Sequence, residues 1–129
     1  AASGINVGKS LCETNLIPLA KELMAQTSIP LPIDMVVAKE FVAESMAATK
    51  LVAEISDDDM ILDIGPQTAA MFADTIAAMK TIIWNGPVGV FEIPQFAHGT
   101  EAIAKAVAAN AGFSIAGGGE TIAAIDTSE

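Results

Sequence analysis

Three consecutive glycines followed by an acid and a threonine form the part of this sequence best suited to bind a ligand: residues 116–121 read AGGGET. Glycines let the backbone approach a ligand without hindrance from Cβ atoms, and a helix that begins there offers free N–H groups and the positive end of its dipole to an anion. A tight turn usually needs only one glycine, and each further glycine costs backbone entropy. The segment therefore predicts a phosphate-binding loop, in which Glu120 could reach a metal ion and Thr121 a phosphate. A carboxylate in the first turn of a helix can equally well serve only to stabilise the helix start, so Glu120 alone does not decide between the two.

Two further turns follow apolar runs. Residues 84–92 read WNGPVGVFE, in which a predicted buried strand ends abruptly in Asn-Gly-Pro and Glu92 stands beyond a Val-Phe pair. Every strand needs a turn, but this composition favours a backbone that lies close to a group that is not protein. Residues 62–68 read LDIGPQT. We expect Asp63 to bond backbone at that turn, and Leu62 and Gly65 to line an apolar slot.

The segment SGINVGKS at residues 3–10 resembles the phosphate loop GxxxxGK[ST] but fails its spacing. Gly4 and Gly8 are one residue too close together, and Ser3 stands where the first glycine belongs. We therefore predict an ordinary turn, without a catalytic role for Lys9. The dinucleotide fingerprint GxGxxG is also absent.

The remaining reactive side chains have ordinary explanations. The single histidine, His98, excludes a multi-histidine metal site within the chain and is predicted to be a surface residue ahead of a helix. The single cysteine, Cys12, is predicted to be a small core residue. The consecutive acids at 57–59 point in different directions, which predicts a solvated turn before a strand.

The elements that position these turns alternate along the chain. Helices are predicted at 15–27, 67–80, 101–111 and after residue 119, with Pro66 in the first turn of the second and Thr100 as the N-cap of the third. Strands are predicted at 33–38, 60–65, 81–84 and 113–116, and residues 39–58 as a loop with a short edge strand. The strands are almost wholly apolar, as is typical of parallel sheets buried on both faces. The pattern predicts an α/β fold, a doubly wound and mostly parallel sheet with helices on both faces, whose three glycine-containing turns share the carboxyl edge.

The charge balance bears on the partners of the chain. The formal net charge is −10, with sixteen acids against six basic residues, all of them lysines. The lack of arginine argues against a nucleic-acid partner, because clustered Lys and Arg supply the affinity for phosphate backbones. The start, AASGINVGKS, lacks both a secretory signal and an initiating Met. We therefore expect one cytoplasmic domain, cut from the interior of a longer chain.

Taken together, WNGPVGVFE, DIGPQT, FSIAGGGET and NVGKSL closely resemble the C-terminal, nucleotide-binding domain of the phosphoglycerate kinase family, in the order and spacing of that family and from end to end of the chain. The resemblance implies a Rossmann-like fold and an ATP-binding transferase of glycolysis. It implies reversible phosphoryl transfer between 1,3-bisphosphoglycerate and Mg-ADP, giving 3-phosphoglycerate and Mg-ATP. It also implies Mg²⁺ with ADP or ATP, 3-phosphoglycerate held by an N-terminal domain, hinge closure of the two domains, and a monomeric parent protein.

The same resemblance implies a set of nucleotide-binding residues. In the family, residues that match Leu11 and Leu62 surround the adenine, and the one that matches Glu92 bonds the ribose. The residue that matches Glu120, more commonly Asp, helps to place the metal-bound phosphates. The other matching positions run beside the nucleotide or face its phosphates: Asn85, Gly86, Pro87, Val88, Val90, Gly117, Gly118, Gly119 and Thr121.

The resemblance also implies what the chain lacks. Residues 1–129 match part of the C-terminal domain, without its first and last parts and without the N-terminal substrate domain. The family supplies positive charge to the moving phosphoryl group from those parts, and no lysine of this chain matches such a position. We therefore predict no catalytic residue and no activity of the chain alone. A non-catalytic nucleotide-binding or scaffold module stays open as an alternative, whereas half of an NAD-dependent dehydrogenase is disfavoured by the missing fingerprint.

Overall fold

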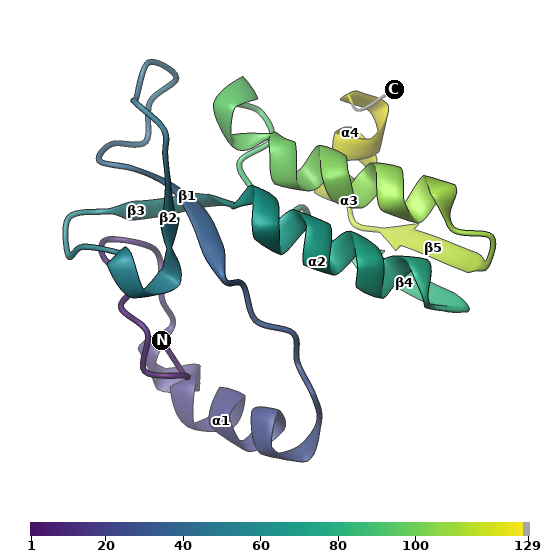
Figure 1. Cartoon of the computed structure of the whole chain (residues 1–129), viewed down its shortest axis with the longest axis horizontal. Coiled ribbons are helices and arrows are strands. Elements are labelled where there is room, and N and C mark those ends of the chain that lie inside the picture. The colour runs from purple at the N-terminus through teal and green to yellow at the C-terminus, as the bar shows by residue number, and fades with distance from the viewer. Residues whose placement is uncertain (128–129) are drawn as a thin grey trace.

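The computed structural model describes residues 1–127, in which two consecutive strands follow the first helices and strands and helices alternate from residue 60 onward (Figure 1). The elements are η1 (Thr14–Leu16), α1 (Ile17–Gln26), β1 (Asp34–Ala38), β2 (Ala48–Leu51), η2 (Val52–Glu54), β3 (Met60–Ile64), α2 (Pro66–Ala77), β4 (Thr81–Asn85), η3 (Pro94–Phe96), α3 (His98–Ala109), β5 (Phe113–Gly117) and α4 (Gly119–Thr127). The fold is α/β, as predicted, and β2 is the predicted edge strand. Within residues 1–127, no helix is both long and apolar enough to cross a membrane.

The strands form two separate sheets within the described residues. One is antiparallel, in the order β2-β1-β3, and the other is the parallel pair β4-β5. The expected single, mostly parallel sheet is thus confirmed only for β4 and β5, because β3 pairs with β1 instead. An apolar run reports that a strand is buried but not which strand lies beside it. The partner of β3 could not be read from its sequence.

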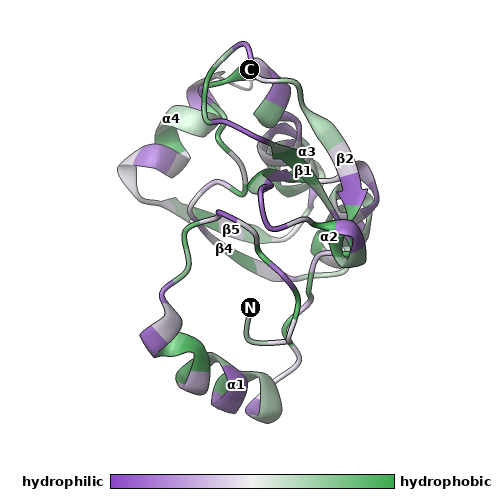
Figure 2. Cartoon of the chain, turned by 90° about the vertical axis from the view of Figure 1, so that its left-hand side faces the viewer, coloured by the Kyte–Doolittle hydropathy of each residue, from purple (hydrophilic) through white to green (hydrophobic). Residues whose placement is uncertain are grey.

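Much apolar surface of this chain is uncovered. Ile83 of β4 is 77% exposed, Phe113 of β5 is 64% exposed, and no residue of α1 is buried. Figure 2 shows α1 apart from the sheets, with hydrophobic residues along it. The expectation that the strands are buried on both faces is therefore wrong for β4 and β5. Cys12 is exposed, so the prediction that it is a small core residue is also wrong.

The core lies where the segment after β4 folds back onto the antiparallel sheet. Phe96 is fully buried against Ala38 of β1 and Leu62 of β3, and Val90 and Ile93 pack around them. The helices α2 and α3 run side by side (Figure 1). This packing holds the stretch that follows the WNGP turn against strand β3.

The start of α2 depends on a buried carboxylate from β1. Asp34 accepts hydrogen bonds from the amides of Gln67 (3.1 Å) and Thr68 (2.7 Å) and from the Thr68 hydroxyl (2.6 Å). Burial by itself would raise the pKa of Asp34, but the hydrogen bonds from Thr68 and Gln67 outweigh it and the pKa lies below its ordinary value. A Cβ atom on Gly65 would overlap this carboxylate, so a glycine is needed there for packing.

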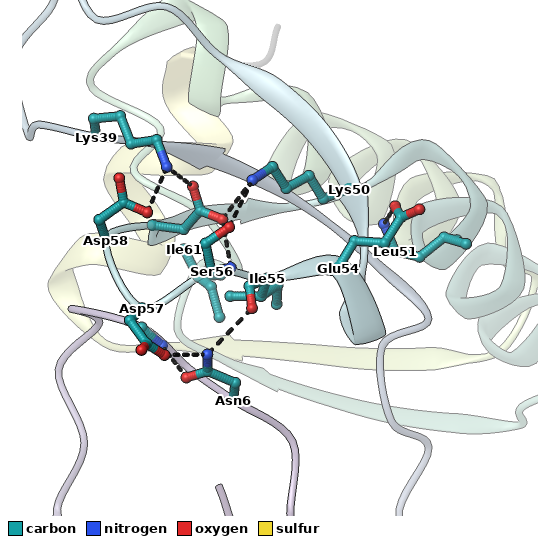
Figure 3. Close-up of polar contacts among 12 residues, drawn as sticks. Asn6, Lys39, Lys50, Leu51, Glu54, Ile55, Ser56, Asp57, Asp58 and Ile61 are labelled. Carbon is teal, nitrogen blue, oxygen red and sulfur yellow. Dashed lines mark hydrogen bonds and ion pairs between the residues drawn. The ribbon is translucent and has the colours of Figure 1, made fainter.

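The acidic turn at 57–59 is only partly solvated, which corrects the prediction. Asp59 is fully buried and binds Lys39 Nζ (2.7 Å), Lys50 Nζ (2.6 Å) and the amide of Ser56 (2.8 Å). The Lys39 and Lys50 ammonium groups hold the pKa of Asp59 well below its usual range. Figure 3 shows Lys39 and Lys50 converging on this turn, with Asp58 also bonded to Lys39.

The N-terminal segment crosses the same turn. The amide of Gly8 binds Asn6 Oδ1, that of Lys9 binds the Asp59 carbonyl, and that of Ser10 binds the Val7 carbonyl. The Ser10 hydroxyl accepts from the Ile61 amide at 2.9 Å. The amides that would hold a phosphate in a GxxxxGK[ST] loop are thus bonded to protein, in agreement with the predicted turn.

Replacing Asp59 with Asn is expected to lower the free energy of unfolding at pH 7 by roughly 1–3 kcal/mol, because charge-assisted hydrogen bonds are lost. Since the folded pKa is depressed, the stabilisation is fully present above the unfolded value of 3.8 and is lost as the pH falls through the folded value. Urea unfolding at pH 7, 5 and 3 should therefore show a constant gap between wild type and variant at the two higher values and a smaller gap at pH 3. Asp58→Asn is the control, because this carboxylate shares Lys39 but is 60% exposed. An equal loss in both variants, or a gap that does not change with pH, would contradict the prediction.

Candidate functional site

Two of the three predicted ligand-binding turns emerge side by side. In the parallel register of β4 and β5, Asn85 lies opposite Gly117, so both strands end at the same edge. The amide of Gly86 donates to the Thr121 hydroxyl at 2.7 Å, which bonds the WNGP turn to the first turn of α4. The expectation that these two turns share an edge is confirmed.

The third turn, after β3, lies in the other sheet, so the expectation that all three turns share one edge is wrong for this turn. Strand β3 itself contacts the segment that follows β4. The carbonyl of Leu62 accepts from the Val90 amide at 2.9 Å. Asp63 accepts from the amides of Ile64 and Gly99, both at 2.8 Å, which confirms its predicted role as a backbone anchor. Burial raises the pKa of Asp63 above its ordinary value, against the opposing effect of the two amide bonds from Gly99 and Ile64.

The stretch from residue 86 to residue 90 has no main-chain donor left for a ligand. Gly86 donates to Thr121 Oγ1, Val88 and Gly89 both donate to Thr100 Oγ1 (3.3 Å each), and Val90 donates to Leu62. Pro87 has no N–H group. This stretch therefore presents carbonyl groups and side chains as a wall, which we call the loop wall (residues 86–90).

The start of α4 is the opposite case. The first amide of this helix that donates a helical hydrogen bond is that of Ile122, which binds the Gly118 carbonyl at 3.1 Å. The preceding amides, those of Gly119, Glu120 and Thr121, therefore have no main-chain acceptor within the helix. Gly118 has a φ of +91°, a conformation that favours glycine. A Cβ atom on Gly117 or on Gly119 would have no neighbour within 4 Å. The fold leaves these two glycines facing open space, beside amides that suit an anion.

A cavity of about 470 Å³ lies between the loop wall and α4. It is lined by Phe41, Pro87, Gly89, Val90, Phe91, Glu92, Ile93 and Glu120. Two carboxylates, Glu92 and Glu120, and no basic side chain are among these residues. Such walls repel a bare phosphate chain but suit one that a divalent cation accompanies, because carboxylate oxygens are ligands of Mg²⁺. Within residues 1–127, no group of three or more His, Cys, Asp or Glu residues could hold a metal ion by itself.

Phe41 is a lining residue that the sequence did not reveal. It lies between β1 and β2 in a stretch without regular structure, and it is 56% exposed. The side chain of Gln95 holds this stretch by donating to the carbonyls of Ala43 (2.7 Å) and Ser45 (2.8 Å). Because these bonds join residues some 50 positions apart, no local pattern could have indicated them.

The other predicted contacts lie in varied surroundings. Leu62 and Thr121 are buried, the first in the core and the second against Gly86, whereas Leu11 is fully exposed. Gly65 packs on Asp34, and the exposed Asn85 places its Oδ1 beside Gly118. Their contacts with a nucleotide stay predictions.

The chain is similar to known proteins over almost its whole length. A family model described as phosphoglycerate kinase matches residues 1–129. The structure of phosphoglycerate kinase from Coxiella burnetii is similar at 42% identity and a TM-score of 0.96, over 98% of this chain and 34% of that chain. Phosphoglycerate kinase from Pyrococcus horikoshii OT3 is similar at 28% identity and a TM-score of 0.84, over 98% of this chain and 33% of that chain. The chain spans about a third of the length of both solved structures.

Proposed function

Because the chain belongs to the phosphoglycerate kinase family, we propose that it forms the nucleotide-binding part of a kinase that transfers a phosphoryl group between 1,3-bisphosphoglycerate and Mg-ADP. The products are 3-phosphoglycerate and Mg-ATP, the reaction is a step of glycolysis, and the enzyme works in the cytoplasm. Residues 1–129 are part of its C-terminal domain, and an N-terminal domain holds 3-phosphoglycerate.

One observation carries this proposal: the β4–β5 register sets the loop wall beside the glycine run that leads into α4, and a cavity there is lined by residues of the loop wall and by Glu120 of α4. In the proposed complex the nucleotide lies in this cavity, with its base against the apolar side chains near Phe41 and Val90 and its ribose at Glu92. Its phosphates meet Gly117, Gly118 and Gly119 and the free amides of α4. Asn85, Gly86, Pro87 and Val88 run beside it, Leu11 and Leu62 lie around the adenine, and Gly65 lines an apolar slot with Leu62.

The two carboxylates that line the cavity, Glu92 and Glu120, indicate how negatively charged phosphates can bind there. Mg²⁺ bound to the nucleotide would supply positive charge between the phosphate oxygens, and Glu120 would hold the complex through its carboxylate. Glu120 is exposed at the start of α4, so its extra methylene relative to Asp can be accommodated in open space. The role of the chain is to bind and orient the nucleotide.

Phosphoryl transfer needs further positive charge on the moving group, and this chain has none to offer at the cavity. It contains no arginine, and the residues that line the cavity include no lysine. Lys39 and Lys50 are engaged by Asp59. We infer that other parts of a family-length enzyme supply the charge, and that the parallel pair β4–β5, whose apolar faces are exposed, belongs to a larger, mostly parallel and doubly wound sheet.

Calorimetric titration tests this function directly. The 129-residue chain is expected to bind Mg-ADP in the millimolar range or tighter and to give no turnover in a coupled kinase assay. Phe41→Ala should weaken binding by about three- to tenfold, because base stacking and apolar contact are lost. Phe113→Ala is the matched control, since this phenylalanine is similarly exposed but lies outside the cavity.

Absence of heat at millimolar Mg-ADP would favour the alternative, a scaffold module derived from the same fold. Turnover by the purified chain would contradict the inference that the catalytic charge comes from elsewhere.

A further inference from the structure

Three helices of this chain share an arrangement at their starts. Thr68, Thr100 and Thr121 are each the third residue of their helix, α2, α3 and α4. All three are buried, and each hydroxyl accepts main-chain N–H groups from outside its own helix. Thr68 receives the amides of Ile33 and Asp34, both at 3.0 Å, and the other two receive amides of the loop wall.

Thr100 is not the N-cap of α3 that the sequence predicted. The helix begins two residues earlier, at His98, and Thr100 Oγ1 points instead at the Val88 and Gly89 amides. Asp63 takes the amide of the preceding residue, Gly99, and thereby holds the first turn of α3 in place. Thr100 is 1% exposed, so little solvent can replace its hydroxyl as an acceptor.

The peptide that Thr100 binds forms part of the cavity. Gly89 lies so close to the Asp63 carboxylate and to the Phe96 carbonyl that a Cβ atom would be 2.5 Å from the latter. Gly89 and the next residue, Val90, line the cavity, and Thr100 is not among its lining residues. Thr100 therefore contacts the loop wall without lining the cavity.

We propose that Thr100 is a positioning residue of the nucleotide site: its hydroxyl anchors the main chain at Val88 and Gly89 and so sets the shape of the wall on which the nucleotide rests. This inference rests on the proposed function for the identity of the ligand, but not for the anchoring itself. Valine at position 100 would keep the shape of the side chain and remove the acceptor, which leaves two partly buried N–H groups without a partner. Those groups would then turn toward water or into the cavity.

Amide hydrogen exchange, followed residue by residue by NMR, tests the anchoring in the 129-residue chain without any nucleotide. In Thr100→Val, exchange at Val88 and Gly89 is expected to accelerate by about tenfold or more relative to other amides, while Gly86, held by Thr121, keeps its protection. Thr100→Ser retains the hydroxyl and should restore protection at both amides. Thr68→Val is the matched control, because it removes a buried threonine hydroxyl of α2 and should accelerate exchange at Ile33 and Asp34 only.

Titration with Mg-ADP then tests the consequence for the site. Thr100→Val is expected to bind about three- to tenfold more weakly than wild type, and Thr100→Ser nearly as well as wild type. Thr68→Val should lose stability but not affinity. The proposal is overturned if exchange at Val88 and Gly89 stays unchanged in Thr100→Val, or if Thr68→Val and Thr100→Val weaken binding equally. A wild-type chain that does not bind Mg-ADP would contradict the proposed function, whereas the exchange pattern would still decide whether Thr100 anchors the wall.

Discussion

Replacing Gly99 with alanine is expected to lower the free energy of unfolding by about 3–5 kcal/mol, since overpacking and loss of buried hydrogen bonds act together. The added Cβ would overlap the Asp63 carboxylate and lie 2.5 Å from Ile64 Cγ1. Asp63 is buried and cannot withdraw without giving up its bonds to the amides of Gly99 and Ile64. Because the same carboxylate touches Gly89, the damage should spread from α3 to the loop wall.

Urea unfolding followed by the fluorescence of Trp84, the single tryptophan, measures this loss. The control is Gly119→Ala, another glycine near the start of a helix, where a Cβ atom would have no neighbour within 4 Å. Its stability should equal or slightly exceed that of wild type, because alanine favours helix. Equal stability of Gly99→Ala and Gly119→Ala would show that Asp63 does not occupy the position described.

Gly119→Ala is expected to weaken Mg-ADP binding by roughly thirtyfold or more, although it leaves the fold intact, because a methyl group would occupy the space where an anion meets the helix amides. Nothing in the protein requires a glycine at this position, since its surroundings are open and its φ is not positive. A ligand that lies against Gly119 would explain why the residue is a glycine. Calorimetry with Mg-ADP on wild type and variant measures the loss.

Gly118→Ala provides the contrast. Gly118 has a φ of +91°, and a Cβ atom there would be 3.0 Å from Asn85 Oδ1. This variant should therefore lose both stability and affinity, whereas Gly119→Ala should lose affinity alone. Wild-type affinity in Gly119→Ala would mean that the glycine run does not face the nucleotide.

The sequence by itself determined the features that depend on neighbours along the chain. The positions of the helices and of the four principal strands followed from periodicity, Gly and Pro to within a few residues. Asp63 was correctly expected to bond backbone at a strand end. The motifs around WNGPVGVFE and GGGET indicated the family, which the match over residues 1–129 confirmed. A motif carries this information because its backbone shape and its side chains are set within a few residues.

Only the tertiary structure decided which elements meet. It paired β3 with β1, buried Asp59 between two lysines, and brought Phe41 to the cavity through the side chain of Gln95. It also showed that Thr100 is not the predicted N-cap and instead accepts hydrogen bonds from the amides of Val88 and Gly89, some ten residues away. Each of these contacts joins segments whose local sequences are compatible with several partners. The turn at WNGP could thus be foreseen from its residues, whereas the threonines behind it, which take up its amides, became visible only once α3 and α4 had been packed against it.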